Sequence, residues 1–145
     1  MVGDNALSNP SLLQIHRYDG VGYQPLVFSG GWQAAILNWE TPIDLANLSE
    51  IERHAGTDEA FVLWRGRAAL YVAADRDVDV VDMEPGLIYN VTRGAWHGLA
   101  ASRDASFVIV ENRDTHLYDT EIRAVTAEER RQLIEKLPEW ARQKP

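Results

Sequence analysis

The sequence predicts an all-β domain followed by one short C-terminal helix. Between about residues 15 and 125, short apolar runs are separated by turn-forming residues at regular intervals, which is typical of a β-sandwich or β-barrel. After residue 125 the apolar residues recur at helical spacing instead. A length of 145 residues suits one domain with its own hydrophobic core. We therefore expect a single domain over residues 1–145, with the barrel at about 15–125 and the helix at about 127–137.

The candidate strands follow a polar segment at the start of the chain. Residues 1–11 contain Asn9-Pro10 and are expected to form a loose lead-in. The apolar runs that follow end at glycine, proline, charged or small polar residues, and they cover residues 26–28, 32–39, 60–64, 68–73, 78–83, 87–91 and 107–110. Because Arg65-Gly66 separates the third run from the fourth, these two runs are expected to pair as a β-hairpin.

The C-terminal helix has a recognisable start, apolar stripe and end. Thr126 and Glu129 have the spacing of a capping box, in which each side chain bonds to the backbone N–H of the other residue. Leu133, Ile134 and Leu137 recur at helical spacing, and Pro138 stops the helix. We expect this helix to close the barrel or to form a partner surface, without chemistry of its own.

Composition excludes several classes of protein. The net charge is -8 and there is no basic stripe, so neither nucleic acid nor an anionic membrane is expected as a partner. The absence of cysteine excludes disulfides, thiolate metal sites and a cysteine nucleophile. No run approaches the roughly 18 apolar residues of a transmembrane helix. The N-terminus has no signal-peptide pattern, so a cytoplasmic location is expected.

Two stretches, residues 52–59 and 86–97, carry the chemistry that the sequence suggests. Side chains alternate between the faces of a strand, so Glu52 and His54 share one face. Residues 55–58 can turn the chain, and Glu59 then opens the next strand, where antiparallel pairing could face it back toward His54. His97 begins a further strand after the turn at Gly94.

Such donors, brought from separate strands to one point, are what a metal site needs. Glu52 and Glu59 would repel each other there unless one took up a proton or a cation lay between them; a metal ion or an arginine would serve. Taken alone, each histidine is better explained as a structural residue that hydrogen-bonds to a neighbour; together, in register with Glu59, the two histidines favour contact with a metal or a substrate. Glu52 could ligate a metal, accept a hydrogen bond from an imidazole, or pair with an arginine.

The spacing of these residues resembles the two motifs of the cupin superfamily over residues 46–101. His54, Glu59 and Gly66 match the first motif, and Gly86, Gly94 and His97 match the second. Glu52 stands in the first histidine slot of the first motif. The departures are Glu52 itself, Ala46 for a glycine, Thr92 for a proline and Ala101 for an asparagine. The resemblance implies a double-stranded β-helix (jelly-roll) barrel, a divalent metal held by His54, Glu59 and His97 with Glu52 as a fourth ligand, and a homodimer.

A second, more local resemblance is to the ureidoglycolate lyase branch of the cupins. It rests on Glu52-Arg53-His54 with Thr57 and Ala60-Phe61, and on Gly86, Tyr89 and Trp96-His97. That family releases urea from ureidoglycolate and leaves glyoxylate. The resemblance implies an elimination in which Glu52, or a metal-bound hydroxide, takes the hydroxyl proton. Tyr89 would orient the substrate or donate a proton; alternatively it packs or makes a structural hydrogen bond.

The sequence thus supports two hypotheses about function. In the first, the protein binds a divalent ion such as Zn, Mn, Fe or Ni and acts as a metal-dependent lyase on a small polar metabolite. In the second, it is a non-catalytic module that binds a small molecule, with Glu52 and Glu59 in ion pairs. His16 and His116 lie outside the motifs and are expected at the surface or in loops. The polar stretch at residues 111–116 is expected to form a loop, with a second site as the weaker alternative. Trp32 and Trp39 are expected in the core or at a dimer interface, and Trp96 in packing.

Overall fold

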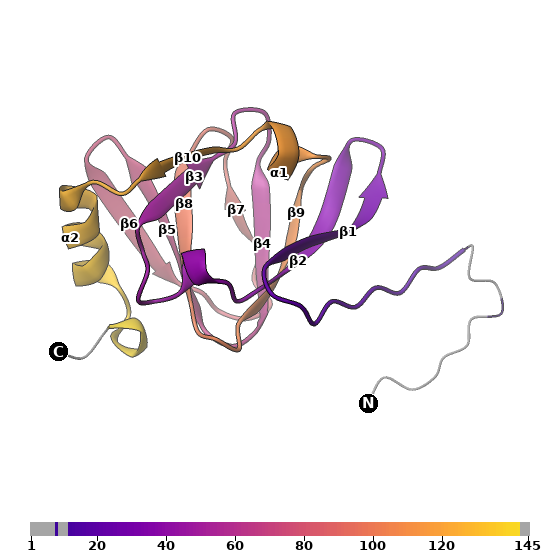
Figure 1. Cartoon of the computed structure of the whole chain (residues 1–145), viewed down its shortest axis with the longest axis horizontal. Helices are drawn as coiled ribbons and strands as arrows, with labels where there is room; N and C mark the ends of the chain where they lie inside the picture. Colours follow the sequence, from indigo (N-terminus) through magenta and orange to yellow (C-terminus); the bar gives the residue numbers. More distant parts are fainter. Residues whose placement is uncertain (1–7, 9–11, 143–145) are drawn as a thin grey trace.

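Two five-stranded antiparallel sheets form the body of the protein in a computed structural model, which describes residue 8 and residues 12–142 (Figure 1). One sheet has the order β1-β2-β9-β4-β7 and the other β10-β3-β8-β5-β6. The predicted lead-in, residues 1–11, lies outside the described residues except for Ser8. The strands are β1 (Tyr23–Ser29), β2 (Trp32–Asn38), β3 (Glu50–Arg53), β4 (Glu59–Arg65), β5 (Ala68–Ala74), β6 (Asp77–Asp82), β7 (Tyr89–Val91), β8 (Trp96–Ala101), β9 (Ser106–Asn112) and β10 (Glu121–Ala124).

Alternation of side chains along the strands builds the core between the sheets. On β4, Phe61 and Leu63 are buried, while the alternating Ala60 and Val62 are half-buried. Phe107 and Ile109 on β9 share this pattern and belong to the same apolar cluster. The cluster continues onto the second sheet through Leu70 and Leu99, among others. The predicted all-β jelly-roll architecture is confirmed.

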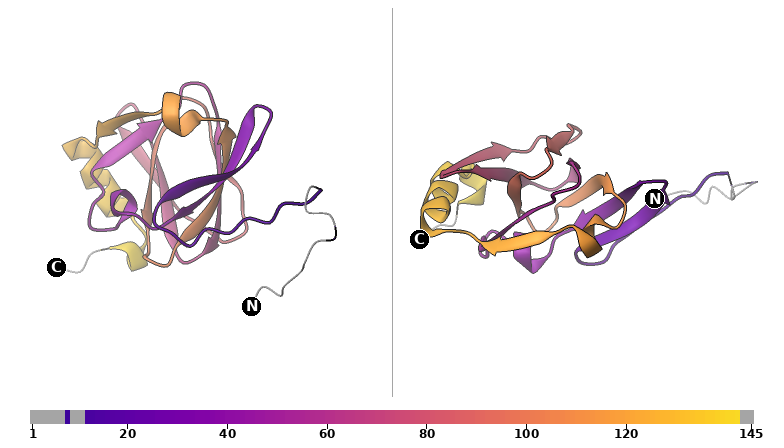
Figure 2. Two further views of the ribbon diagram at one scale, coloured as in Figure 1. Left: turned by 45° about the vertical axis from the view of Figure 1, so that its right-hand side comes forward. Right: turned by 90° about the horizontal axis from the view of Figure 1, so that it is seen from above.

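The C-terminal helix α2 (Ala127–Lys136) covers the outer face of the second sheet. Its capping box is formed as predicted: Thr126 Oγ1 accepts from the Glu129 N–H, and Glu129 accepts from the Thr126 N–H. Leu133 and Leu137 are buried against a cluster from β3, β5, β6 and β8, whereas Ile134 is half-exposed. Figure 2 shows α2 at the end of the molecule away from the β1–β2 hairpin.

The shorter helical segments are η1 (Thr41–Ile43), α1 (Thr115–Tyr118) and η2 (Glu139–Ala141). Among the described residues, no helix is both long and apolar enough to cross a membrane.

The predicted hairpin between residues 60–64 and 68–73 is wrong. These residues form β4 and β5, which belong to different sheets. Both strands bury apolar side chains in the same core, so the chain turns from one sheet to the other at Gly66. Gly66 has φ 77°, and a Cβ there would lie 2.5 Å from Ala105 Cα, so this crossing requires a glycine. Strand β10 was not predicted from the sequence; it pairs with β3.

Candidate metal centre

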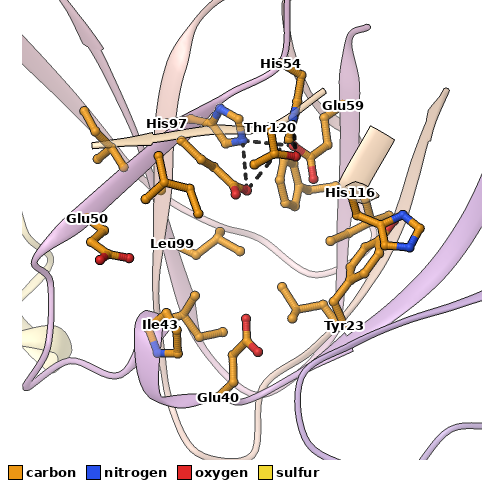
Figure 3. A pocket seen from close by; sticks show the side chains of 18 of the residues that line it. Tyr23, Glu40, Ile43, Glu50, His54, Glu59, His97, Leu99, His116 and Thr120 are labelled. Atoms are coloured by element: carbon orange, nitrogen blue, oxygen red, sulfur yellow. Dashed lines mark hydrogen bonds and ion pairs between the residues drawn. The ribbon is translucent and has the colours of Figure 1, made fainter. Parts of the chain in front are cut away.

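Four side chains from both sheets meet at one point inside the barrel. Glu52 lies on β3, His54 follows that strand, Glu59 opens β4, and His97 lies on β8. One ligand atom from each of these residues lies within 4.8 Å of those from the other three. Figure 3 shows His54, Glu59 and His97 pointing toward one another. We call this group, Glu52, His54, Glu59 and His97, the histidine–glutamate centre. The structure therefore brings together all four residues that the sequence predicted as metal ligands.

Glu59 lies between the two histidines of the centre. Its Oε2 lies 2.7 Å from His54 Nε2 and 2.9 Å from His97 Nε2. All three side chains are buried, with 2–5% of their surface exposed. Glu59 does face His54, as expected, but the antiparallel pairing that was expected to bring them together is wrong, because β3 and β4 lie in different sheets. The two residues meet across the barrel, since the turn at residues 55–58 carries the chain between the sheets.

Backbone carbonyls fix the orientation of both imidazoles. His54 Nδ1 lies 2.8 Å from the Asp119 oxygen, and His97 Nδ1 lies 2.9 Å from the Ala95 oxygen. Because a carbonyl oxygen can only accept, Nδ1 carries the hydrogen in each ring. Each Nε2 is then left to face Glu59, either protonated or with its lone pair free for a metal ion.

The three buried groups, His54, Glu59 and His97, stabilise one another's charged forms. Burial alone lowers the pKa of His54, but its contacts with Glu59 and the Asp119 carbonyl outweigh this and raise the pKa to about 9. The pKa of His97 is raised in the same way, with Glu59 outweighing burial. Burial raises the pKa of Glu59, and the two histidines more than reverse that effect. Without a metal, the stable arrangement is therefore a carboxylate between protonated histidines.

Glu52 stands at the edge of the centre. It is the ladder partner of His97 between β3 and β8. Its Oε1 lies 3.7 Å from His97 Nε2 and 3.9 Å from His54 Nε2, too far for hydrogen bonds. The side chain is 39% exposed, and burial together with the charge of Glu59 raises its pKa. Glu52 is thus the member of the centre that a ligand in the barrel could reach.

A third carboxylate, Glu111, lies beside the centre and was not predicted as a site residue from the sequence. It is the register partner of Glu59 between β9 and β4, and its Oε2 lies 3.8 Å from His54 Nε2. Its Oε1 accepts a 2.5 Å hydrogen bond from the Tyr23 hydroxyl. Burial and the nearby charge of Glu59 raise the pKa of Glu111 to about 7. The alternation of Phe107, Ile109 and Glu111 along one strand could have indicated this residue, because it places a carboxylate on a buried face.

Other polar groups near Glu111 come from segments outside the two motifs. Gln33 Nε2 donates to the Tyr23 hydroxyl at 2.8 Å and lies 3.1 Å from His116 Nδ1. The rings of Tyr23 and His116 lie 5.4 Å apart. The expected loop over residues 111–116 is in part regular structure: β9 extends to Asn112, and α1 begins at Thr115. Of this stretch, Glu111 and the exposed His116 line the cavity.

The centre opens into a cavity of about 310 Å³. Its walls combine apolar side chains with carboxyl groups, and Figure 3 shows Glu40 and Glu50 pointing into it across from His54, Glu59 and His97. Its apolar walls include Leu37, Ile43, Phe61, Leu99 and Ile109. A cavity of this size and character suits a small organic molecule.

The sequence-predicted residues Tyr89 and Trp96 do not line this cavity. The Tyr89 hydroxyl accepts a hydrogen bond from the Glu84 N–H at 2.8 Å, and the ring packs against the core. The Trp96 ring lies against the guanidinium groups of Arg53 and Arg123, each 4.7 Å from its centroid. Trp32 is exposed at the start of β2, and Trp39 Nε1 donates to Asp44.

The donor set of the histidine–glutamate centre fits a divalent metal ion. Two imidazoles present Nε2 with Nδ1 held by carbonyl oxygens, which is the usual outer support of a metal-binding histidine. Glu59 supplies a buried carboxylate between them, and Glu52 a fourth oxygen donor. Imidazole and carboxylate donors suit Zn, Mn, Fe and Ni, and do not favour Cu(I).

Comparison with known proteins gives structural likenesses only. No protein-family model matches the chain, and no curated protein sequence matches it significantly. KdgF from Halomonas sp. is similar with a TM-score of 0.50 and 13% identity, over 66% of this chain and 82% of that one. A cupin-2 domain protein from Shewanella frigidimarina has a TM-score of 0.47 and 24% identity, over 71% of this chain and 87% of that one. The iron(II) form of HppE has a TM-score of 0.49 and 14% identity, over 62% of this chain and 48% of that one.

These comparisons concern the fold and not the activity. The two facing sheets, their strand order and the similarity to KdgF agree with the jelly-roll barrel that the motif spacing predicted. The chain has a jelly-roll fold, with a histidine–glutamate centre inside the barrel.

Proposed function

We propose that this protein binds one divalent metal ion at the histidine–glutamate centre and acts as an enzyme on a small polar metabolite. The observation that carries the proposal is the convergence of two buried imidazoles on Glu59, each with its Nδ1 held by a backbone carbonyl. A fixed donor set beside a cavity is the usual arrangement of a catalytic metal site with room for a substrate.

When bound, the metal supplies a Lewis acid that polarises a carbonyl or carboxylate oxygen of the substrate. The protein's own contribution is a base. Glu52 suits this role because it is the most exposed member of the centre and it lines the cavity. His54 and His97 keep their positions through their carbonyl contacts while Glu52 exchanges protons with the substrate.

The reaction type that we propose is a C–N elimination from a carbon that also carries a hydroxyl group. Glu52 removes the hydroxyl proton, the O–H electron pair forms the C=O bond, and the C–N electron pair leaves on nitrogen. The protonated Glu52 then passes that proton to the leaving nitrogen, so atoms and charge balance without another reactant. The local resemblance to the ureidoglycolate lyases motivates this choice, and ureidoglycolate is the first compound to assay.

Metal content and the behaviour of Glu52 test the proposal. Purified protein is expected to hold about one divalent ion per chain by elemental analysis, and His97→Ala to lose it. Glu52→Gln is expected to retain most of the metal, since three donors remain, while turnover of any cleaved substrate falls at least ~100-fold. Glu84→Gln, an exposed carboxyl outside the cavity, is the matched control. Urea release that survives His97→Ala unchanged would contradict a metal-dependent lyase.

A second candidate function follows from the same contacts. With both histidines protonated, Glu59 is fully paired without a metal, so the barrel could serve as a non-catalytic binding module. Protein that contains no stoichiometric metal, and that shows no thermal shift with Mn, Fe, Ni or Zn, would favour this function over the enzyme.

A further inference from the structure

Three hydroxyl groups line the cavity beside the histidine–glutamate centre, and two of them have acceptors within the protein. They belong to Tyr23, Tyr71 and Thr120. The Tyr23 hydroxyl donates to Glu111 Oε1, and the Thr120 hydroxyl donates to the Thr115 carbonyl at 3.1 Å. The Tyr71 hydroxyl makes no hydrogen bond to any residue that the structure describes. Tyr71 therefore carries the hydroxyl of this cavity that is free to bind a ligand.

Tyr71 is buried, yet its hydroxyl keeps contact with open space. The residue is 3% exposed. Two buried side-chain atoms among the described residues have neither a hydrogen-bond partner nor accessible surface, and they are Arg53 Nε and Glu111 Oε2. The Tyr71 hydroxyl is not one of them, so it retains accessible surface, and the residue lines the cavity. Because a buried tyrosine hydroxyl usually has a partner, a ligand in the cavity would supply the acceptor that the protein does not.

Gly98 allows the Tyr71 ring to reach the cavity. Tyr71 on β5 is the register partner of Gly98 on β8. The tyrosine belongs to the apolar cluster beneath α2, and a Cβ at Gly98 would overlap the Cζ atom and the hydroxyl of the ring. Gly98 also lines the cavity, so the tip of the ring lies over a position of β8 that has no side chain. A larger residue at position 98 would displace the hydroxyl.

The Tyr71 hydroxyl lies on the Glu52 side of the cavity. Gly98 directly follows His97, and His97 is the register partner of Glu52. Burial and the charge of Glu52 raise the pKa of Tyr71, so the hydroxyl keeps its proton and remains a donor. The same negative charge disfavours an anionic oxygen beside Tyr71 and leaves a neutral acceptor as the better partner. An anionic oxygen is better placed at the histidine–glutamate centre, where charged imidazoles or a metal ion supply positive charge.

We propose that the Tyr71 hydroxyl binds a neutral carbonyl oxygen of the substrate, of the amide or urea type, and holds it on the Glu52 side of the cavity. The Tyr71 O–H donates, the carbonyl oxygen accepts, and no covalent bond changes. This inference rests on the proposed function for the role of Glu52 as base. It narrows the substrate class to molecules that carry both an anionic oxygen and a neutral carbonyl group. Tyr71 thereby has the orienting role expected of Tyr89, which does not line the cavity.

A cycle of two protein forms and two kinds of ligand tests the assignment. Tyr71→Phe removes the hydroxyl and keeps the ring beneath α2. N-acetylglycine and hydantoate carry a carboxylate and a neutral carbonyl but no hydroxyl that could react, and propionate lacks the neutral carbonyl. All three are titrated into the full chain by calorimetry. Tyr71→Phe is expected to bind the first two ~3- to 10-fold more weakly than wild type, the effect of one neutral hydrogen bond, and to bind propionate equally well.

The matched control is Tyr118→Phe, which removes an exposed hydroxyl on α1 from a residue that does not line the cavity. This variant is expected to bind all three ligands as wild type does. Equal affinities of wild type and Tyr71→Phe for N-acetylglycine and hydantoate, or no binding of either by wild type at ~10 mM, overturn the inference. An equal loss of affinity for propionate also overturns it, because that result indicates altered packing instead of a lost hydrogen bond.

Urea release and metal content, measured on the same samples, separate this inference from the proposed function. If the ligand cycle gives the expected result but ureidoglycolate is not cleaved, the lyase reaction fails and Tyr71 remains a ligand-binding residue. If ureidoglycolate is cleaved and its KM is the same in wild type and Tyr71→Phe, the assignment of Tyr71 fails and the lyase reaction stands.

Discussion

Glu59 decides at the scale of single residues whether the centre holds protons or a metal ion. Its Oε2 contacts both imidazoles, and the same Nε2 atoms would have to lose their protons to ligate a metal. Protons and metal therefore compete for one set of atoms, and the outcome depends on pH.

We predict opposite pH dependences for the two forms of the protein. The pKa of His54 is raised to about 9 in the folded protein, above its value of about 6.5 in the unfolded chain. Its contribution to the stability of the metal-free protein is thus fully present below pH ~6.5 and is lost as the pH rises through about 9. The midpoint of thermal unfolding of chelator-treated protein is expected to fall over this range. With metal in excess, the midpoint is expected to rise instead, because deprotonation favours metal binding.

The matched variant for this experiment is Glu59→Gln. An amide cannot hold the two imidazoles in their charged form, so the fall in stability between pH ~6.5 and 9 is expected to shrink strongly. Identical pH profiles for wild type and variant would show that the His–Glu59 contacts do not control the charge of the centre.

The four members of this centre were predicted from the sequence, but the neighbouring Glu111 was not. His54, Glu59 and His97 were predicted because they share the spacing of two known motifs, and Glu52 because alternation places it beside His54. Glu111 was not predicted, because no motif includes it and its partners Tyr23 and Gln33 lie 88 and 78 positions away in the chain. Contacts at that separation depend on which strands become neighbours, and a single sequence does not state this.

At the scale of elements, the change of sheet between β4 and β5 depends on Gly66. Gly66 and Gly94 both adopt positive φ, of 77° and 82°. A Cβ at Gly66 would meet the backbone of Ala105, whereas one at Gly94 would have no atom within 4 Å. The sequence indicated a turn at Gly66, but not whether the next strand pairs with β4 or joins the other sheet. The alternation of buried and exposed side chains is the same in both cases.

This difference predicts unequal costs for two similar substitutions. Gly94→Ala is expected to lower the free energy of unfolding by about 1 kcal/mol, the cost of positive φ for a non-glycine residue. Gly66→Ala should cost at least ~2 kcal/mol more, because backbone must also move. Chemical denaturation of both variants measures the difference. Equal values would mean that the contact with Ala105 does not constrain the crossing.

At the scale of the whole molecule, the two sheets differ in what covers their outer faces. Helix α2 packs on the second sheet, whereas an apolar row stays exposed or half-exposed on the first. The row comprises Trp32, Ala34 and Ile36 of β2, Val108 and Val110 of β9, and Ala60, Val62 and Trp64 of β4. An apolar face of this kind typically marks an interaction surface.

We predict that this face joins two copies of the chain as a homodimer. The resemblance to the cupin motifs implies a homodimer, and we propose the apolar row as its interface. Val110→Glu, in register with Ala34 and Ala60, is expected to give a monomer in light-scattering measurements. Val81→Glu, at an exposed position of β6 on the other sheet, is the control and should stay dimeric. A wild-type protein that is monomeric at ~100 μM would contradict the prediction.

The sequence by itself determined the class of fold, the C-terminal helix and the four residues of the histidine–glutamate centre. These features depend on local periodicity, capping and motif spacing, which are properties of neighbouring residues in one chain. Only the tertiary structure decided that β4 and β5 separate, that β10 pairs with β3, and that Glu111, Tyr23 and His116 reach the cavity. The physical reason is that burial and charge inside the barrel arise from contacts between both sheets, and the strand order alone sets those contacts.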